Sequence, residues 1–150
     1  MHHRVFVYGT LLRGQVNHGL LARAQFGAQF LGSHRTEPRF TLFLLGAYPG
    51  LVAGGSTAVL GEVYRVNDAG LRALDRLEDY PRLYDRTLVQ TPYGRAWVYL
   101  YRGGVGDRPV IASGDWRALA STGLPLRAAA IRNRPDPKNP SRRRRISGSG

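Results

Sequence analysis

A chain of 150 residues with 43% hydrophobic residues is long enough for one domain with a core of its own. It contains no cysteine, which excludes disulfides, thiol chemistry and most structural zinc sites. No apolar run approaches the roughly 18 residues that a membrane span needs. The N-terminus has no stretch typical of a secretory signal, so we expect a cytoplasmic protein without a membrane partner.

The positive charge is concentrated at one end of the chain. Half of the formal net charge of +12 comes from residues 132–150, which hold seven basic residues and one acid. This basic, Pro/Arg-rich tail cannot bury enough apolar surface to fold, so we expect it to be disordered or to lie across the body. Residues 1–131 form the predicted domain. Nucleic-acid binding by the tail is a weaker alternative to a solvated tail, because no aromatic residues are interleaved with its arginines.

Apolar and alternating runs predict a chain dominated by strands. We expect a short helix after Asn17 and another over 116–119, capped by Asp115. The one long helix should cover residues 69–79, with Asn67 or Asp68 as its cap and Pro81 ending it. The predicted strands are 3–8, 28–35, 40–45, 51–52, 58–66, 84–91 and 95–101. Strands that outnumber helices and are joined by tight turns predict an α+β fold, a small mostly antiparallel β-barrel or curled sheet with a few flanking helices.

The loop from Tyr8 to Gly14 follows the first predicted strand. A glycine directly after a buried strand allows a sharp turn, and such a turn leaves N–H groups that can bind an anion or an oxyanion. An ordinary turn that needs glycine for its φ angle is the plainer interpretation. A phosphate-binding loop is disfavoured, because Gln15 occupies the position where that motif requires lysine.

A carboxylate interrupts the apolar side of the long predicted helix. Leu71, Leu74 and Leu77 mark that side, and Glu78 lies four residues after Leu74. Burial and the negative end of the helix should both raise the pKa of Glu78 towards the range of a general acid or base. The alternative is a structural pair with Arg76, Arg82 or Arg86. Asp75 and Asp79 lie off the stripe, and we expect them to be more solvated.

Other residue types carry weaker signals. The four histidines show no spacing typical of metal ligands, so we predict no metal site. No serine lies in a G-x-S-x-G motif. Buried or rim positions are the usual places for tyrosines such as Tyr48, Tyr80, Tyr84, Tyr99 and Tyr101. No pattern in the chain specifies an oligomeric state.

Four stretches together resemble the gamma-glutamylcyclotransferase-like (AIG2-like) family, and most of all its gamma-glutamylamine cyclotransferase branch. The first and third stretches, in this order and about 65 residues apart, are a specific combination. The resemblance spans residues 4–117 and does not include the tail. The stretches are residues 6–15 with Asn17 and His18, 47–52, 74–86 and 112–116.

The resemblance implies an enzyme that needs no cofactor or metal. Its substrate would be a small gamma-glutamyl amine, amide or peptide, which is converted to 5-oxoproline and a free amine by attack of the substrate's own α-amine. Glu78 would be the general acid/base, and the leaving amine remains open. A non-catalytic metabolite-binding module on the same fold is the alternative. The implied substrate-binding residues are Tyr8, Gly9, Thr10 and Leu11, and Tyr48, Gly50 and Tyr84 are further candidates for the pocket.

Overall fold

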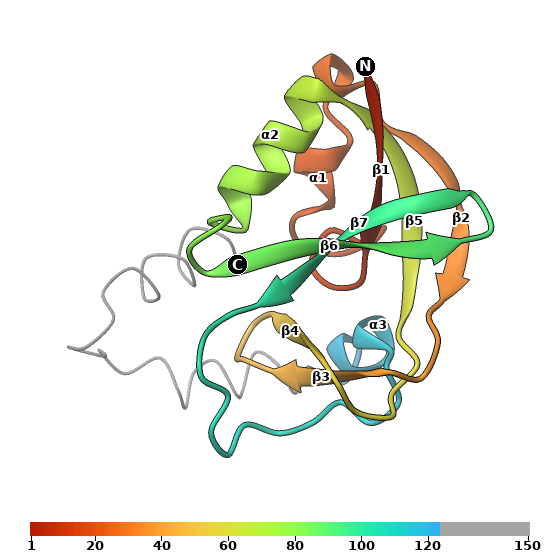
Figure 1. Ribbon diagram of the computed structural model, residues 1–150. Coiled ribbons are helices and arrows are strands. Elements are labelled where there is room, and N and C mark those ends of the chain that lie inside the picture. Colours follow the sequence, from red (N-terminus) through yellow and green to blue (C-terminus); the bar gives the residue numbers. More distant parts are fainter. Residues whose placement is uncertain (124–150) are drawn as a thin grey trace.

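Strand β1 (His2–Val7) lies at the centre of a five-stranded mixed sheet (Figure 1). The computed structural model describes residues 1–123. Val5, Phe6 and Val7 are at most 3% exposed, which suits a strand covered on both faces. Strand β1 is antiparallel to β5 and parallel to β7. The sheet order is β2-β5-β1-β7-β6, with β2 at Gln29–Arg35, β5 at Leu60–Asn67, β6 at Tyr84–Thr91 and β7 at Gly94–Tyr101.

A separate hairpin of β3 (Phe40–Leu44) and β4 (Pro49–Ala53) lies beside the main sheet, below it in Figure 1. Strand β4 packs against β7. Gly50 makes this close approach possible: a Cβ atom there would lie 2.5 Å from Leu45 and 3.0 Å from Tyr101. The hairpin therefore brings the turn before Pro49 towards the end of β1.

The α+β class is confirmed, but the sheet is curled and not closed into a barrel. It curls so far that a Cβ atom on Gly32 of β2 would lie 1.8 Å from the hydroxyl of Tyr93, in the β6–β7 turn. The pairing of β2 with β5 also shifts register between Phe30 and Gly32, as a bulge does. A groove lined by residues 34–40 and 87–92 separates the two edges, so β2 and β6 do not form the ladder that would close a barrel.

Helix α2 (Asp68–Leu77) lies diagonally across one side of the sheet (Figure 1). The Asn67 side chain accepts a hydrogen bond from the Gly70 N–H at 2.9 Å, which confirms a cap predicted from the sequence. Leu71 and Leu74 are buried, so the predicted apolar stripe faces the core. Asp115 caps α3 as predicted. The shorter helices are α1 (His18–Leu21), the 3-10 helix η1 (Ala24–Phe26) and α3 (Trp116–Ala120).

The predicted tail, residues 132–150, lies outside the described residues. In the described part of the chain, no helix combines the length and apolar character that crossing a membrane requires.

Replacing Leu74 with alanine tests the packing of α2. The Leu74 side chain is 1% exposed, so Leu74→Ala should lower the free energy of unfolding by about 2–5 kcal/mol through lost burial and a cavity. Urea denaturation measures the change. Arg72→Ala, at an exposed position on the same helix, is the matched control and should change stability by about 0.5 kcal/mol or less. If Leu74→Ala and Arg72→Ala lowered the free energy of unfolding equally, the packing of α2 against the sheet would be contradicted.

Candidate active site

The loop after β1 turns sharply and keeps three N–H groups unused. Leu12 N–H donates to the Gly9 carbonyl oxygen at 3.1 Å, and Asn17 N–H donates to the Thr10 carbonyl oxygen at 2.8 Å. Within residues 1–123, the N–H groups of Gly9, Thr10 and Leu11 donate to no other atom of the chain. Consecutive N–H groups of this kind can hold an anionic oxygen.

Gly9 is required by close approach and not by its φ angle. Its φ is not among the positive values found in the chain. A Cβ atom at Gly9 would lie 2.6 Å from Cγ and 2.8 Å from Cδ of Pro49, the first residue of β4. The loop backbone therefore lies directly against the β3–β4 hairpin. The interpretation as a turn needing glycine for its φ angle does not apply at Gly9, but it does apply at Gly14, which has a φ of 84°.

Glu78 marks the point where helix α2 ends. The chain reverses after it through Asp79, which has a left-handed φ of 53°. Tyr80 N–H donates to the Asp75 carbonyl oxygen at 2.9 Å and Asp79 N–H to that of Arg76 at 3.2 Å, which is a Schellman ending with aspartate in the place glycine usually takes. Glu78 is half-buried and follows the leucine stripe, so its side chain is carried towards the sheet.

The loop and the helix end meet in one pocket, which encloses about 530 Å³ with its open mouth included. Every sequence-predicted site residue except Gly50 lines it. Gly50 is instead a buried residue of β4 that faces Tyr101 of β7. Among the lining residues within 1–123, Glu78 is the only aspartate, glutamate, lysine or arginine. The lining consists of Phe6, Val7, Tyr8, Gly9, Thr10, Leu11, Asn17, Tyr48, Pro49, Glu78, Tyr84 and Tyr99.

Two tyrosine hydroxyls hold the pocket walls together. The Tyr8 hydroxyl donates to the carbonyl oxygen of Tyr99 at 2.8 Å and accepts from the N–H of Leu51 at 3.2 Å. The Tyr84 hydroxyl donates to the carbonyl oxygen of Pro49 at 3.1 Å. These bonds tie the loop to β7 and β4, and β6 to β4. The role of Tyr84 in binding substrate stays a prediction, as does the raised pKa of Glu78.

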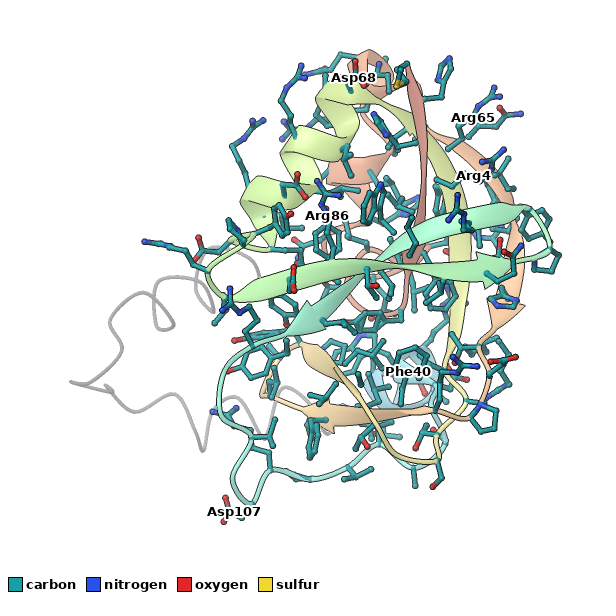
Figure 2. The ribbon with its side chains drawn as sticks, in the orientation of Figure 1. Arg4, Phe40, Arg65, Asp68, Arg86 and Asp107 are labelled. Carbon is teal, nitrogen blue, oxygen red and sulfur yellow. The ribbon has the colours of Figure 1, made fainter. Side chains whose placement is uncertain are left out.

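Asp75, which was predicted to be more solvated than Glu78, is held by an ion pair. Its side chain is only 20% exposed and accepts two hydrogen bonds from Arg86, at 3.0 and 3.3 Å. Arg86 in turn lies between the rings of Tyr80 and Trp97, 4.4 and 4.2 Å from their centroids. Figure 2 shows the Arg86 side chain between the helix and the β6–β7 pair. The interactions that bury Asp75 come from residues distant in sequence.

Tyr99 is a pocket residue that sequence reasoning left among the core and rim tyrosines. Its hydroxyl donates to Asp75 at 2.7 Å. Burial, this hydrogen bond and the charges of Asp75 and Glu78 raise the pKa of Tyr99 well above its usual value, so the phenol stays protonated. Asn17 was predicted to precede a short helix and belongs to the first of the stretches that resemble the family. Its side chain makes no cap bond and donates instead to the Thr10 hydroxyl at 3.0 Å.

Sequence reasoning also gave no role to Glu62, a fully buried carboxylate behind the loop. Its side chain is 2% exposed and accepts from the Arg13 backbone N–H at 3.0 Å, Arg13 Nε at 2.9 Å and Arg117 at 3.0 Å. Tyr64 donates a fourth bond at 3.1 Å. Burial acts to raise the pKa of Glu62, but these donors outweigh it and hold the pKa below its usual value. A glutamate within an alternating strand gave no local signal of these partners.

Several known proteins are similar to this chain in sequence and in fold. The sequence model of the family described as "Gamma-glutamyl cyclotransferase, AIG2-like" matches residues 5–118. A Vibrio cholerae protein is 47% identical over 116 residues, which cover 77% of this chain and 96% of the relative. The mouse protein named gamma-glutamylaminecyclotransferase is 42% identical over 91 residues, covering 57% of this chain and 61% of the relative. The crystal structure of an AIG2-like protein from mouse matches with a TM-score of 0.67 at 33% identity, over 76% of this chain and 88% of that one.

The curled sheet, with a pocket between the first loop and the end of the long helix, defines a small α+β domain built around a carboxylate site. The match of the family model and of these relatives identifies the class more closely. The chain belongs to the gamma-glutamylcyclotransferase (AIG2-like) family, as the resemblance predicted.

Replacing Gly9 with alanine tests the contact with Pro49. The added methyl group has no room, so Gly9→Ala should destabilise the protein by about 1–3 kcal/mol and displace the loop. Urea denaturation measures the stability. Gly19→Ala, in α1 where a Cβ atom meets nothing within 4 Å, is the control and should be neutral or slightly stabilising. A Gly9→Ala variant as stable as wild type would show that the loop does not need this approach.

The hydrogen bonds that Glu62 accepts from Arg13, Arg117 and Tyr64 predict that the protein loses stability in acid. Because the folded-state pKa of Glu62 lies below 4.5, the unfolded chain binds its proton first as the pH falls. The contribution of Glu62 is therefore complete above about pH 5 and is lost as the pH falls below 4.5. Urea denaturation from pH 7 to pH 3 should show the stability advantage of wild type over Glu62→Gln shrinking in acid. An advantage that stays constant over this range would contradict the prediction.

Proposed function

We propose that this chain converts a gamma-glutamyl amine, amide or peptide into 5-oxoproline and a free amine. The observation that supports this most strongly is that Glu78 lines one pocket with Gly9, Thr10 and Leu11, whose N–H groups have no partner within residues 1–123. A proton-transfer group and a cradle for negative charge are the two parts that such an acyl transfer needs. Family membership and the name of the mouse relative point to the same reaction.

The substrate would bind with its glutamyl end against the loop. The N–H groups of residues 9–11 would hold either the α-carboxylate or the oxyanion formed from the δ-carbonyl. Glu78 would receive the α-ammonium, because opposite charges attract strongly in a pocket with little water. The rings of Tyr48 and Tyr84, which also line the pocket, would enclose the aliphatic part of the glutamyl group.

The chemistry then requires one general acid/base. Glu78 takes a proton from the α-ammonium, and the freed amine attacks the δ-carbonyl carbon to close a five-membered ring. The bond from that carbon to the leaving nitrogen breaks as Glu78 returns the proton to it. The ring nitrogen loses its second proton to the departing amine, which leaves as an ammonium ion. The nucleophile and the carbonyl belong to one molecule, so folding the substrate supplies much of the rate advantage.

Replacing Glu78 with glutamine tests the assignment. Glutamine keeps the shape but cannot transfer the proton, so the rate of 5-oxoproline formation should fall by about 10²–10⁴-fold. The assay offers gamma-glutamyl amines and gamma-glutamyl peptides separately and measures 5-oxoproline. Circular dichroism verifies that the variant is folded.

Asp79→Asn is the matched control for this experiment. It changes the neighbouring carboxylate to an amide, and asparagine also tolerates the left-handed conformation. Its activity should stay close to that of wild type. Full activity in Glu78→Gln would refute the role of Glu78. Wild-type protein that binds these compounds without forming 5-oxoproline would favour a metabolite-binding module instead.

A further inference from the structure

Glu62 lies directly behind the point where the proposed substrate loop leaves the sheet. In the β1–β5 ladder it is the partner of Val7, the last residue of β1. It does not line the pocket. We infer that Glu62 is a positioning residue, whose buried carboxylate fixes the loop so that the N–H groups of residues 9–11 stay aligned in the pocket. This inference rests on the proposed function for the role of the loop.

The contact that fixes the loop is made to its backbone. Arg13 follows Leu11 by two residues, and its peptide N–H donates to Glu62 at 3.0 Å. A bond to a peptide group restrains the chain itself, whereas a bond to a side chain leaves the backbone freer to move. The loop's internal bonds direct the carbonyl oxygens of Gly9 and Thr10 to the N–H groups of Leu12 and Asn17. With the Arg13 peptide held as well, the loop is restrained at both ends of residues 9–11.

Helix α3 supports the same loop from its outer side. Arg117 donates to Glu62 at 3.0 Å, and the indole N–H of Trp116 donates to the side-chain oxygen of Gln15 at 3.2 Å. Trp116 is 2% exposed, so this support is anchored in the core. The segment that closes the described chain thus bonds directly to Gln15, just after the loop, and reaches the loop a second time only through Glu62 of β5.

The site requires a carboxylate and not merely a polar group. One oxygen of Glu62 accepts from the Arg13 N–H and the Tyr64 hydroxyl, and the other accepts from the guanidinium groups of Arg13 and Arg117. Glutamine would present its NH₂ group, which only donates, to at least one of these pairs of donors. It would also leave two guanidinium groups facing a neutral partner. Glu62→Gln should therefore loosen the loop while changing the side-chain volume little.

Amide hydrogen exchange, followed by NMR on the full chain, measures the loop without any substrate. In Glu62→Gln, the amides of Leu12 and Asn17 should exchange at least about tenfold faster, because their hydrogen bonds close the loop. The amide of Val98, in the core strand β7, should keep its wild-type rate. Arg13→Met is the matched control: it removes the Arg13 guanidinium but keeps the peptide N–H, so it should accelerate exchange less.

Kinetics with a gamma-glutamyl substrate provide the second readout. At a temperature where circular dichroism shows a folded variant, kcat/KM of Glu62→Gln should fall by about 10²-fold, since small displacements of a binding loop are costly.

Should Glu62→Gln not fold, Arg117→Met, which keeps the charge of Glu62 and its bonds to Arg13, should show the same changes to a smaller extent. If the wild-type protein forms no 5-oxoproline, the proposed function is wrong. The amide exchange rates alone then test whether Glu62 positions the loop. Loop exchange within twofold of wild type, or equal acceleration at Val98, would overturn the inference.

Discussion

The site depends on how closely the loop after β1 lies against the start of β4. The Tyr8 hydroxyl, bonded to the Tyr99 carbonyl oxygen and the Leu51 N–H, draws the loop to two strands at once. Gly9 then contacts the Pro49 ring at a distance that no side chain would permit. These contacts hold the loop against β4 and β7, and they leave the N–H groups of residues 9–11 without partners in the described chain.

The other half of the site depends on the rotation of helix α2. Leu71 and Leu74 are buried against the sheet, and this fixes which side of the helix faces inward. Glu78 follows Leu74 by four residues and so shares that side. The left-handed turn at Asp79 ends the helix at this point, and the chain can then enter β6 without covering the pocket. The helix end thus places a carboxylate at the pocket wall through the same packing that stabilises the fold.

Local signals in the sequence were sufficient for the elements and for the two halves of the site. Alternation predicted β6 and β7 almost to the residue, and the leucine spacing singled out Glu78. The partners of Asp75 could not be predicted, because Arg86 and Tyr99 come from strands whose order in the sheet no periodicity specifies. Barrel closure was predicted wrongly for a related reason: the curl of the sheet includes a register shift in β2, which brings Gly32 against Tyr93 of the β6–β7 turn, and no local pattern predicts that contact.

Two carboxylates near the site, Asp75 and Glu62, each accept hydrogen bonds from guanidinium groups, and these donors hold the pKa of Glu62 below its usual value, which keeps it ionised. Such groups suit a rigid frame, since their geometry is set by several donors. A general acid/base needs the opposite property, a protonation state that changes during the reaction. Under the proposed function, Glu78 has the suitable place: it is half-buried at the pocket wall, where the ammonium of a bound substrate would meet it.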